Sequence, residues 1–168
     1  MDISNKKHFL TVKDYSVSQE TFDLYHDEEL DMLITYPQPS LENLGKYYES
    51  VDYISHTDSK RSLFEKCYHF IKSVALKNKL NLVNSLQPAK GSILDIGAGT
   101  GDFLSVVKEN GWNTIGVEPS EKAKAIAKRK GVSFVEETSE LENNSFDVIT
   151  MWHVLEHVPN LDNQIKEL

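Results

Sequence analysis

Cysteine is almost absent from the sequence, and long apolar runs are missing altogether. Cys67 is the only cysteine in 168 residues, which excludes an intrachain disulfide and a zinc site built from cysteines. No run approaches the ~18 apolar residues of a membrane-spanning helix. Residues 1–7 also lack the apolar core of a secretory signal. We therefore expect a cytoplasmic protein without a membrane span.

An excess of positive charge is lacking too. The formal net charge is −8, and Lys and Arg are scattered apart from short clusters such as residues 128–130. This pattern disfavours broad binding to a phosphate backbone, so we expect no nucleic-acid partner. Apolar residues make up 39% and charged residues 26% of the chain, the mixture of an ordinary globular protein. The length suits one domain with a small appendage.

The first part of the chain has the pattern of a small β-structure followed by a short helix. Residues 21–25 alternate apolar and polar side chains, as a half-buried strand does, and residues 32–36 predict a second strand. The acidic segment 27–29 between them suits a hairpin loop. Pro37 ends the second strand, because proline cannot donate to the β-ladder. A short helix is expected over 41–48, after a serine N-cap.

A long helix is predicted after a loop over residues 49–59. Apolar side chains recur in it at helical spacing, and we expect this stripe to pack in the core. The stripe consists of Leu63, Cys67, Phe70, Ile71, Val74, Leu80 and Val83.

From about Ala89 onward, strand and helix signals alternate. Gly111 and Gly131 suit the left-handed C-terminal caps of two of the helices. A chain that alternates strands and helices in this way forms a parallel sheet. The predicted fold class is therefore α/β, a Rossmann-like parallel sheet with helices on both faces. The strands are expected over 92–96, 113–118, 132–135 and 146–151, and the helices over 102–110, 120–131 and from 160.

The sharpest feature is a glycine-rich loop between a predicted buried strand and a predicted helix. Gly97, Gly99 and Gly101 occupy alternate positions, and glycine permits positive φ angles and a close approach of the backbone to a ligand. A dinucleotide loop has the spacing G-x-G-x-x-G and holds a pyrophosphate at the helix N-terminus. Here Asp102 stands in place of the last glycine, and Asp95 precedes the loop. These carboxylates favour a cationic ligand over a pyrophosphate.

Residues 95–101, Asp-Ile-Gly-Ala-Gly-Thr-Gly, resemble the first motif of the class I S-adenosylmethionine-dependent methyltransferases, D/E-x-G-x-G-x-G, and match it fully. The resemblance implies S-adenosylmethionine as cofactor and S-adenosylhomocysteine as product. S-adenosylmethionine carries a sulfonium and an amino group but no phosphate, which agrees with carboxylates beside the loop. The cofactor-binding residues expected in this segment are Asp95, Gly97, Ala98, Gly99, Gly101, Asp102 and Phe103.

A second matching segment lies at residues 116–120. In the family, an acid at the end of the second strand accepts hydrogen bonds from both ribose hydroxyls, and a carboxylate can accept two donors at once. Glu118 stands 23 residues after Asp95, close to the ~20-residue offset of a Rossmann-type ribose acid. The resemblance thus implies Glu118 and Pro119 as cofactor-binding residues. The adenine contact stays open among Glu136, Glu137 and Thr138.

A third segment, residues 146–159, resembles the subgroup that ends its fourth strand with Leu-Glu-His-Val. That subgroup includes ubiquinone-type O-methyltransferases and many sugar and small-molecule methyltransferases. The resemblance implies a small-molecule acceptor, with Glu156 and His157 near the mouth where it enters. It also implies cofactor contacts from Met151, Trp152 and His153.

Three roles are open for His153, Glu156 and His157, which share one face if this turn is helical. His157 could act as a general base toward an acceptor hydroxyl, and it is our candidate catalytic residue. The three side chains could instead bind a divalent metal, or they could cap the helix and shape the pocket. His153 replaces a glutamate of the metal-binding relatives, so we expect no metal.

The N-terminal part resembles an extension of some of these methyltransferases, in which two cysteines three apart help to bind zinc before a Pro-x-Pro turn. When the sequences are aligned on residues 37–39, Asp27 and Leu30 occupy those positions, so we expect no structural zinc. A hairpin is expected to remain, with a cap over the cofactor, although packing or surface roles explain the cap residues equally well. The cap candidates are Tyr47, Tyr48, Tyr53 and His56.

The predicted division is an extension over 1–58, a connecting helix over 59–88 and an S-adenosylmethionine-binding domain over 89–168. The family's sheet has seven strands, whereas this chain ends after the fourth. We therefore expect a truncated fold, inactive alone, with an apolar sheet edge that can pair with another copy in a homo-oligomer. The predicted function is methyl transfer to a small molecule. A nicotinamide-dependent oxidoreductase and a non-catalytic cofactor-binding module are the alternatives.

Overall fold

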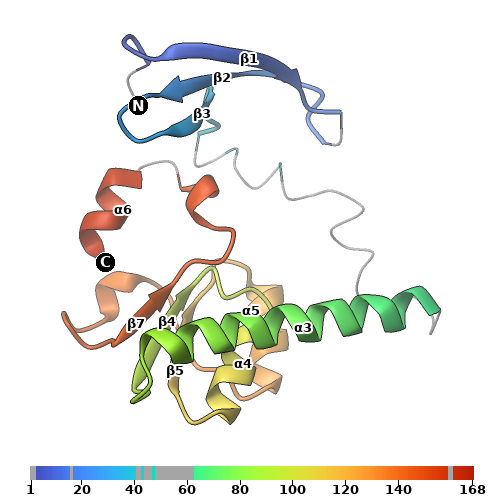
Figure 1. The fold of residues 1–168 in the computed structure, drawn as a ribbon, viewed down its shortest axis with the longest axis vertical. Coiled ribbons are helices and arrows are strands. Elements are labelled where there is room, and N and C mark those ends of the chain that lie inside the picture. The colour runs from blue at the N-terminus through green and yellow to red at the C-terminus, as the bar shows by residue number, and fades with distance from the viewer. Residues whose placement is uncertain (1–2, 16, 41–42, 44–46, 48–62, 159–160) are drawn as a thin grey trace. The chain divides into compact units, whose positions relative to one another are not determined.

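The computed structural model describes residues 3–15, 17–40, 43, 47, 63–158 and 161–168, without the side chains of 63–67. The chain separates into two compact units, Met1–Lys60 and Arg61–Leu168 (Figure 1). Each unit has its own sheet.

The first unit contains a three-stranded antiparallel sheet in the order β1-β2-β3. Its strands are β1 (Lys7–Lys13), β2 (Thr21–Asp27) and β3 (Met32–Tyr36). The predicted hairpin is confirmed as β2 and β3. Strand β1 extends it, and the sequence pattern misses this strand for a physical reason. A bulge between His8 and Leu10 interrupts the pairing, and every residue of β1 is exposed.

Asp27 holds the turn between β2 and β3. Its buried carboxylate accepts hydrogen bonds from the amides of Glu29 at 3.0 Å and Leu30 at 3.2 Å, and it pairs with the Lys6 ammonium. Asp side chains often close turns by bonding backbone groups a few residues on. At a position where the resemblance would place a zinc-binding cysteine, Asp27 therefore stabilises this turn through hydrogen bonds and an ion pair.

The second unit contains a four-stranded parallel sheet in the order β6-β5-β4-β7. The predicted α/β fold class with a parallel sheet is thus confirmed. The strand order reverses at β4. In sheets of this kind, the ligand site lies beside the carboxyl ends of the strands where the order reverses. The strands are β4 (Ser92–Ile96), β5 (Asn113–Val117), β6 (Phe134–Val135) and β7 (Val148–Thr150). The helices are α3 (Leu63–Leu86), α4 (Asp102–Glu109), α5 (Glu121–Arg129) and α6 (Leu161–Glu167), with 3-10 turns η2 (Thr138–Glu140) and η3 (Leu155–His157).

Three strands are shorter than predicted, β5 by its last residue and the other two by more. Of residues 132–135 only the last two form β6, because the Val132 amide donates to the Ala127 carbonyl at the end of α5. Gly131, with a φ of 76°, makes that turn and confirms the predicted cap. Of residues 146–151 only Val148–Thr150 form β7.

Asp147, the residue before β7, connects the start of this strand to β4 through its side chain. Its carboxylate accepts from the Ser92 amide at 2.8 Å and from the Ser92 hydroxyl at 3.0 Å. A Cβ on Gly91 would lie 2.1 Å from the Asp147 Oδ2 atom. A glycine is therefore required at position 91 for this carboxylate to reach the backbone.

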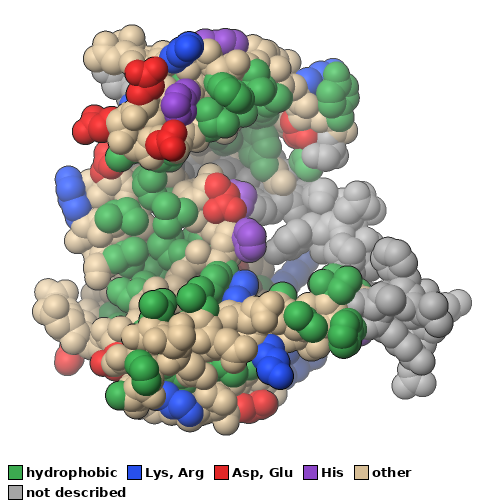
Figure 2. All heavy atoms as spheres, in the orientation of Figure 1, with side chains coloured by type: hydrophobic (Ala, Val, Ile, Leu, Met, Phe, Trp, Pro, Cys, Tyr) green, Lys and Arg blue, Asp and Glu red, His purple; other side chains and the backbone are tan. Residues whose placement is uncertain are grey.

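Among the side chains that are described, those of helix α3 that join the core come from its C-terminal half, where Val83 is buried and Leu76 and Leu80 pack against the core cluster. The prediction that the whole stripe is buried is wrong. The helix has 24 residues and is about 36 Å long, whereas five-residue strands extend only about 17 Å. Its first half therefore runs past the sheet (Figure 1), and hydrophobic side chains are exposed on this face of the molecule (Figure 2). The exposed members are Phe70 at 69%, Ile71 at 66% and Val74 at 43%.

Two predictions lie partly outside the described residues. Of the helix over 41–48 only residues 43 and 47 are described, and of the four cap candidates Tyr48, Tyr53 and His56 are not described. Tyr47 is described. Its hydroxyl donates to Glu20, and its ring lies edge-on to Phe22 at 6.2 Å. Among the helices described, none is long and apolar enough to cross a membrane.

Candidate functional site

The glycine-rich loop leads from the carboxyl end of β4 into α4. Gly97, Gly99 and Gly101 have φ angles of 72°, 53° and 69°, which residues with a side chain rarely adopt. The amides of Gly97 and Ala98 donate to the Val117 carbonyl at 2.8 and 3.1 Å. The loop is therefore fastened to the end of β5, and its shape requires glycine.

The three glycines have different surroundings. A Cβ on Gly97 would lie 2.3 Å from a methyl carbon of Val154, and one on Gly101 would lie 2.6 Å from the Cβ of Ala127. A Cβ on Gly99 would meet nothing within 4 Å. Packing accounts for the first and third glycines, whereas the middle one borders open space where a ligand can approach the backbone.

Glu118 links this loop to the end of β5. It is only 9% exposed, and its two oxygens accept from the Gly99 amide at 2.8 Å and from the Ser120 amide at 2.9 Å. Each carboxylate oxygen can accept two hydrogen bonds, so both keep a free acceptor position. Ser120 also caps α5 through the Ala123 amide, as predicted. The acid expected from the sequence thus lies against the glycine loop.

Asp95 is a second buried acid beside the loop. It is 2% exposed and accepts a hydrogen bond from the Thr150 hydroxyl at 2.6 Å. Burial raises the pKa of Asp95 to about 6, although the Thr150 bond and the charge of Lys79 lower it, and the charge of Glu118 raises it further. The folded protein therefore holds an acid that is costly to ionise unless a cation balances it.

Asp102, at the first position of α4, is already balanced by cations. Its carboxylate accepts from Lys130 at 2.8 Å, from Lys72 at 2.7 Å and from the Thr100 hydroxyl at 2.6 Å. Burial raises the pKa of Asp102, but these bonds outweigh burial and hold it at about 2. Asp102 therefore repels a pyrophosphate less than the sequence alone indicates.

An aromatic pair and a lysine lie next to the acids. Phe103 and Trp152 meet edge to face, with ring centroids 5.4 Å apart. The Lys79 Nζ atom, from α3, lies 4.4 Å from the centroid of the Trp152 ring. The Nε1 atom of Trp152 is buried and has no hydrogen-bond partner among the described residues. The site thus contains a buried donor that lacks an acceptor.

Lys79 and Thr150 are the site residues that sequence reasoning misses. Lys79 directly precedes Leu80 and lies one turn before Val83, both on the packed side of α3. A lysine within an apolar stripe is the signal that could reveal it. Thr150 ends β7, and its partner Asp95 is distant in sequence but adjacent in the parallel register.

The candidate acceptor residues lie in the exposed turn after β7. His153 has a φ of 59° and precedes η3, which contains Glu156 and His157. The three side chains are exposed, and the His153 Nδ1 atom is 3.8 Å from the Glu156 Oε1 atom. Among the described residues, no group of three or more His, Cys, Asp or Glu side chains could hold a metal ion.

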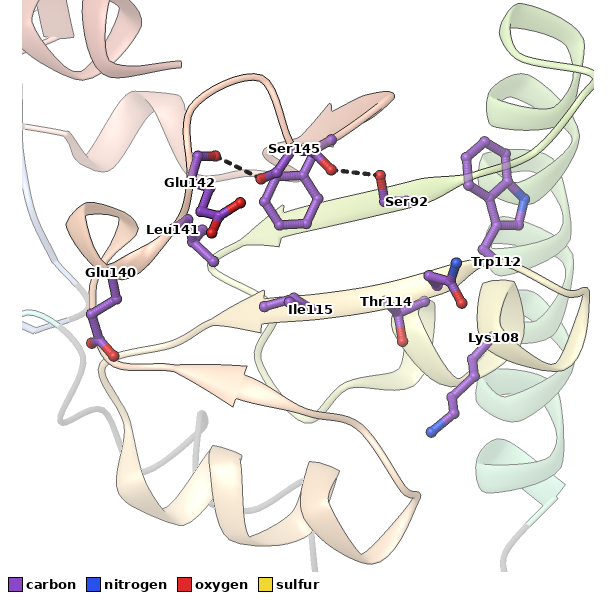
Figure 3. Close-up of a pocket in the computed structure, with 11 residues that line it drawn as sticks. Ser92, Lys108, Trp112, Thr114, Ile115, Glu140, Leu141, Glu142 and Ser145 are labelled. Atoms are coloured by element: carbon purple, nitrogen blue, oxygen red, sulfur yellow. Dashed lines mark hydrogen bonds between the residues drawn. The ribbon is translucent and has the colours of Figure 1, made fainter.

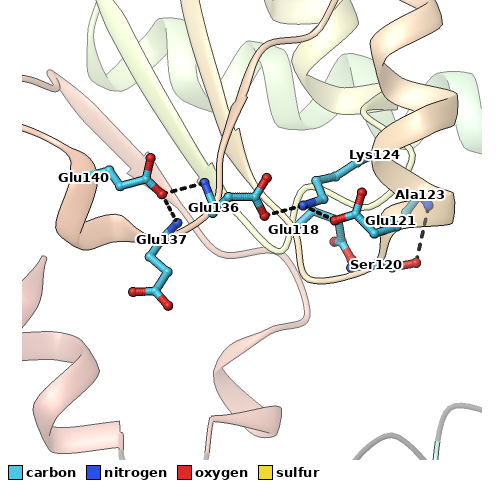
Figure 4. Close-up of polar contacts among 8 residues, drawn as sticks. All are labelled: Glu118, Ser120, Glu121, Ala123, Lys124, Glu136, Glu137 and Glu140. Carbon is cyan, nitrogen blue, oxygen red and sulfur yellow. Dashed lines mark hydrogen bonds and ion pairs between the residues drawn. The ribbon is translucent and has the colours of Figure 1, made fainter.

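A polar cluster fixes the loop between β6 and η2 (Figure 4). Lys124 is 1% exposed and pairs with Glu121 at 2.5 Å and Glu136 at 2.6 Å. The Glu140 carboxylate accepts from the amides of Glu136 and Glu137, both at 3.0 Å. Glu136 and Glu137, two of the three candidates for an adenine contact, are therefore held in place by these bonds.

A pocket also lies toward the amino ends of β4 and β5 (Figure 3). Ser92 and Asn113, the first residues of these strands, line it together with Ile115 and Leu141. It includes none of the predicted cofactor-binding residues. Because ligands of such sheets bind at the carboxyl ends of the strands, the glycine loop is the candidate site.

Comparison with known proteins gives a family for the second unit. A family model described as a methyltransferase domain matches residues 60–168. The ubiquinone biosynthesis O-methyltransferase of Hahella chejuensis (strain KCTC 2396) is 31% identical over 78 residues, which are 40% of this chain and 33% of that protein. The enzyme of the same name from Bordetella avium (strain 197N) is 27% identical over 111 residues, 60% of this chain and 45% of that protein. The chain thus spans less than half the length of either relative.

Among solved structures, magnesium protoporphyrin IX methyltransferase from Synechocystis PCC 6803, with SAM bound, matches with a TM-score of 0.54. The two are 17% identical, and the match covers 74% of this chain and 68% of that chain. At this identity the likeness concerns the fold, and it agrees with the parallel α/β sheet.

Proposed function

The chain belongs to the methyltransferase-domain family, and from this premise we propose that it binds S-adenosylmethionine (SAM) and serves methyl transfer to a small molecule. The observation that carries the proposal is the position of Glu118. This acid ends β5 and bonds the amide of Gly99, where the loop borders open space. Its two free acceptor positions suit the two ribose hydroxyls of an adenosine.

The residues present fit the chemistry of SAM. Asp95 and Glu118 are buried carboxylates without an ion-pair partner among the described residues, and SAM brings a sulfonium and an amino group. Trp152 has a buried N–H in need of an acceptor, and SAM carries a carboxylate. We assign Glu118 to the adenosine end of SAM and Asp95 to its amino-acid end.

The other residues expected to contact the cofactor follow from their place on the loop and on the turn after β7. Bound SAM supplies a methyl group on positively charged sulfur. The chain's own residues then have to bind and orient the reactants, and positioning alone can provide much of the rate. The further cofactor-contacting residues that we propose are Gly97, Ala98, Gly99, Gly101, Asp102, Phe103, Pro119, Met151, Trp152 and His153.

We propose that the acceptor is a small metabolite such as a sugar or a quinone-like compound. Both curated relatives are named ubiquinone biosynthesis O-methyltransferases, which supports a hydroxyl as the group methylated. His157 is exposed in the turn after β7 and is the candidate to accept a hydroxyl proton. The alternative is that Glu156 and His157 only shape the entrance.

Further proposals concern the whole protein. We propose that the chain divides into an extension over 1–58, a connecting helix over 59–88 and a cofactor domain over 89–168. The lone Cys67 supports a cytoplasmic location, and the net charge of −8 supports a partner other than nucleic acid. Strand β7 lies at an edge of the described sheet, which supports pairing with another copy through this edge.

Titration calorimetry with S-adenosylhomocysteine tests the proposed cofactor. Wild-type chain should bind it, and Glu118→Ala should weaken binding by about 1.5–3 kcal/mol through loss of a charge-assisted bond. Glu109→Ala is the matched control, because Glu109 is an exposed acid on α4.

The outcomes separate the alternatives. A folded wild type that binds NADH but not S-adenosylhomocysteine would favour an oxidoreductase and contradict the proposal. Binding without transfer to any of a panel of sugars and quinols would favour a non-catalytic module. Unchanged binding by Glu118→Ala would remove the role proposed for this acid.

A further inference from the structure

Lys79 brings a positive charge to the candidate site from outside the glycine loop. Its Nζ atom lies over the ring of Trp152 at 4.4 Å from the centroid. It is also close enough to the buried Asp95 for the two charges to interact. Lys72 of α3 and Lys130 at the end of α5 are both paired with Asp102, the first residue of α4. Lys79 has no ion-pair partner among the described residues, so its charge remains available.

A half-buried ammonium that forms no direct ion pair is unfavourable, and burial lowers the pKa of Lys79 although the charge of Asp95 raises it. The face of Trp152 compensates in part, because a cation over an indole gains about 0.5–2 kcal/mol. The same indole has a buried Nε1–H without an acceptor among the described residues. Within the described part of the chain, the indole N–H thus lacks an acceptor and the ammonium lacks an ion-pair partner, so a negatively charged ligand group beside them would be favourable.

The charges at the site match those at the amino-acid end of SAM, which is a zwitterion. Asp95 is negative and suits the amino group, whereas Lys79 is positive and suits the carboxylate. We propose that Lys79 binds the carboxylate of the cofactor's amino-acid end and that the ring of Trp152 holds the ammonium in place. This inference rests on the proposed function. It adds a cofactor-binding residue that lies outside every motif of the sequence.

Two probes separate this role from a structural one. S-adenosylhomocysteine carries the carboxylate, and 5′-methylthioadenosine has the same adenosine and thioether but lacks the amino-acid end. We expect Lys79→Met to weaken binding of S-adenosylhomocysteine about 10- to 100-fold, the range of a charge-assisted bond. Binding of methylthioadenosine should change by less than about twofold. Lys77→Met removes an exposed lysine of the same helix and should change neither affinity.

Each other outcome decides against the inference. Equal weakening of both probes by Lys79→Met means that the lysine only supports the fold of the site, and unchanged affinity for both means that it does not reach the ligand. If Lys79→Met does not fold, Lys79→Arg and Lys79→Gln replace it. The arginine should retain S-adenosylhomocysteine binding and the glutamine should lose it, and equal affinities would overturn the assignment. A folded wild type that binds neither probe contradicts the proposed cofactor itself, which is a different failure.

Discussion

Asp95→Asn tests whether a buried carboxylate is kept for its ligand at a cost in stability. Asp95 is 2% exposed, and Thr150 donates to it at 2.6 Å. Asparagine has nearly the same shape, and its carbonyl oxygen can keep the bond from Thr150. The substitution therefore removes mainly the charge.

The size and sign of the effect follow from the pKa. Burial raises the pKa of Asp95 from 3.8 to about 6, and at about 1.4 kcal/mol per pH unit the folded state disfavours the ionised form by about 3 kcal/mol. Because the folded protein holds this proton more tightly, the stability that Asp95 contributes is fully present below about pH 4 and is lost as the pH rises through about 6. Asp95→Asn should therefore be more stable than wild type by about 1–3 kcal/mol at pH 7.5, and nearly equal to it at pH 4.

Urea unfolding from pH 4 to 8 measures this difference, with the exposed Asp162→Asn as the control for a lost surface charge. The same variant should bind S-adenosylhomocysteine more weakly, since stability and function often conflict at ligand sites. If Asp95→Asn is no more stable than wild type at pH 7.5, the acid is not desolvated as the structure indicates. The argument from its charge then fails.

Two further substitutions should destabilise the chain. Burial raises the pKa of Asp102, but the bonds from Lys130, Lys72 and Thr100 hold it at about 2. The stability that Asp102 contributes to the fold is therefore present above about pH 4 and is lost as the pH falls through 2. Because its side chain is partly exposed, Asp102→Asn should lower the free energy of unfolding by only about 1 kcal/mol at pH 7, measured by urea unfolding. A loss of stability that persists below pH 2 would contradict this role of the Asp102 charge. Gly91→Ala places a Cβ 2.1 Å from the Asp147 carboxylate and should cost about 1–3 kcal/mol. An unchanged thermal midpoint would show that Asp147 does not fasten β7 to β4.

The sequence predicts the centre of the site because its signals there are local. Positive φ angles at Gly97, Gly99 and Gly101 require glycine, so the loop conformation is encoded at the residues that adopt it. Two local signals show that Glu118 stands at the end of a strand. One is the buried apolar strand before the loop, and the other is the N-cap serine that follows the next strand. The position of the acid at the loop then follows from the rule that parallel strands end at one edge of a sheet.

Partners from distant segments are not encoded locally, and there the sequence is less informative. The bond from Thr150 to Asp95 depends on the pairing of β7 with β4. Lys79 reaches the site because α3 packs along the sheet. Helical periodicity identifies the apolar face of α3 but not how far the sheet extends beneath it, which is why Phe70 and Ile71 are exposed.

The structure also changes which acids decide between ligands. Asp102 is neutralised by two lysines, so it does not distinguish a pyrophosphate from a sulfonium. Asp95 does, because it is buried and forms no ion pair with a described residue, whereas an acid such as Glu118 can bind the ribose of either ligand. The charge of Glu118 further raises the pKa of Asp95, and a pyrophosphate would increase this repulsion. A ligand that brings an ammonium and a carboxylate would instead balance Asp95 and complement Lys79. On the function proposed above, the preference for SAM over a dinucleotide therefore rests on these charges more than on the spacing of the glycines.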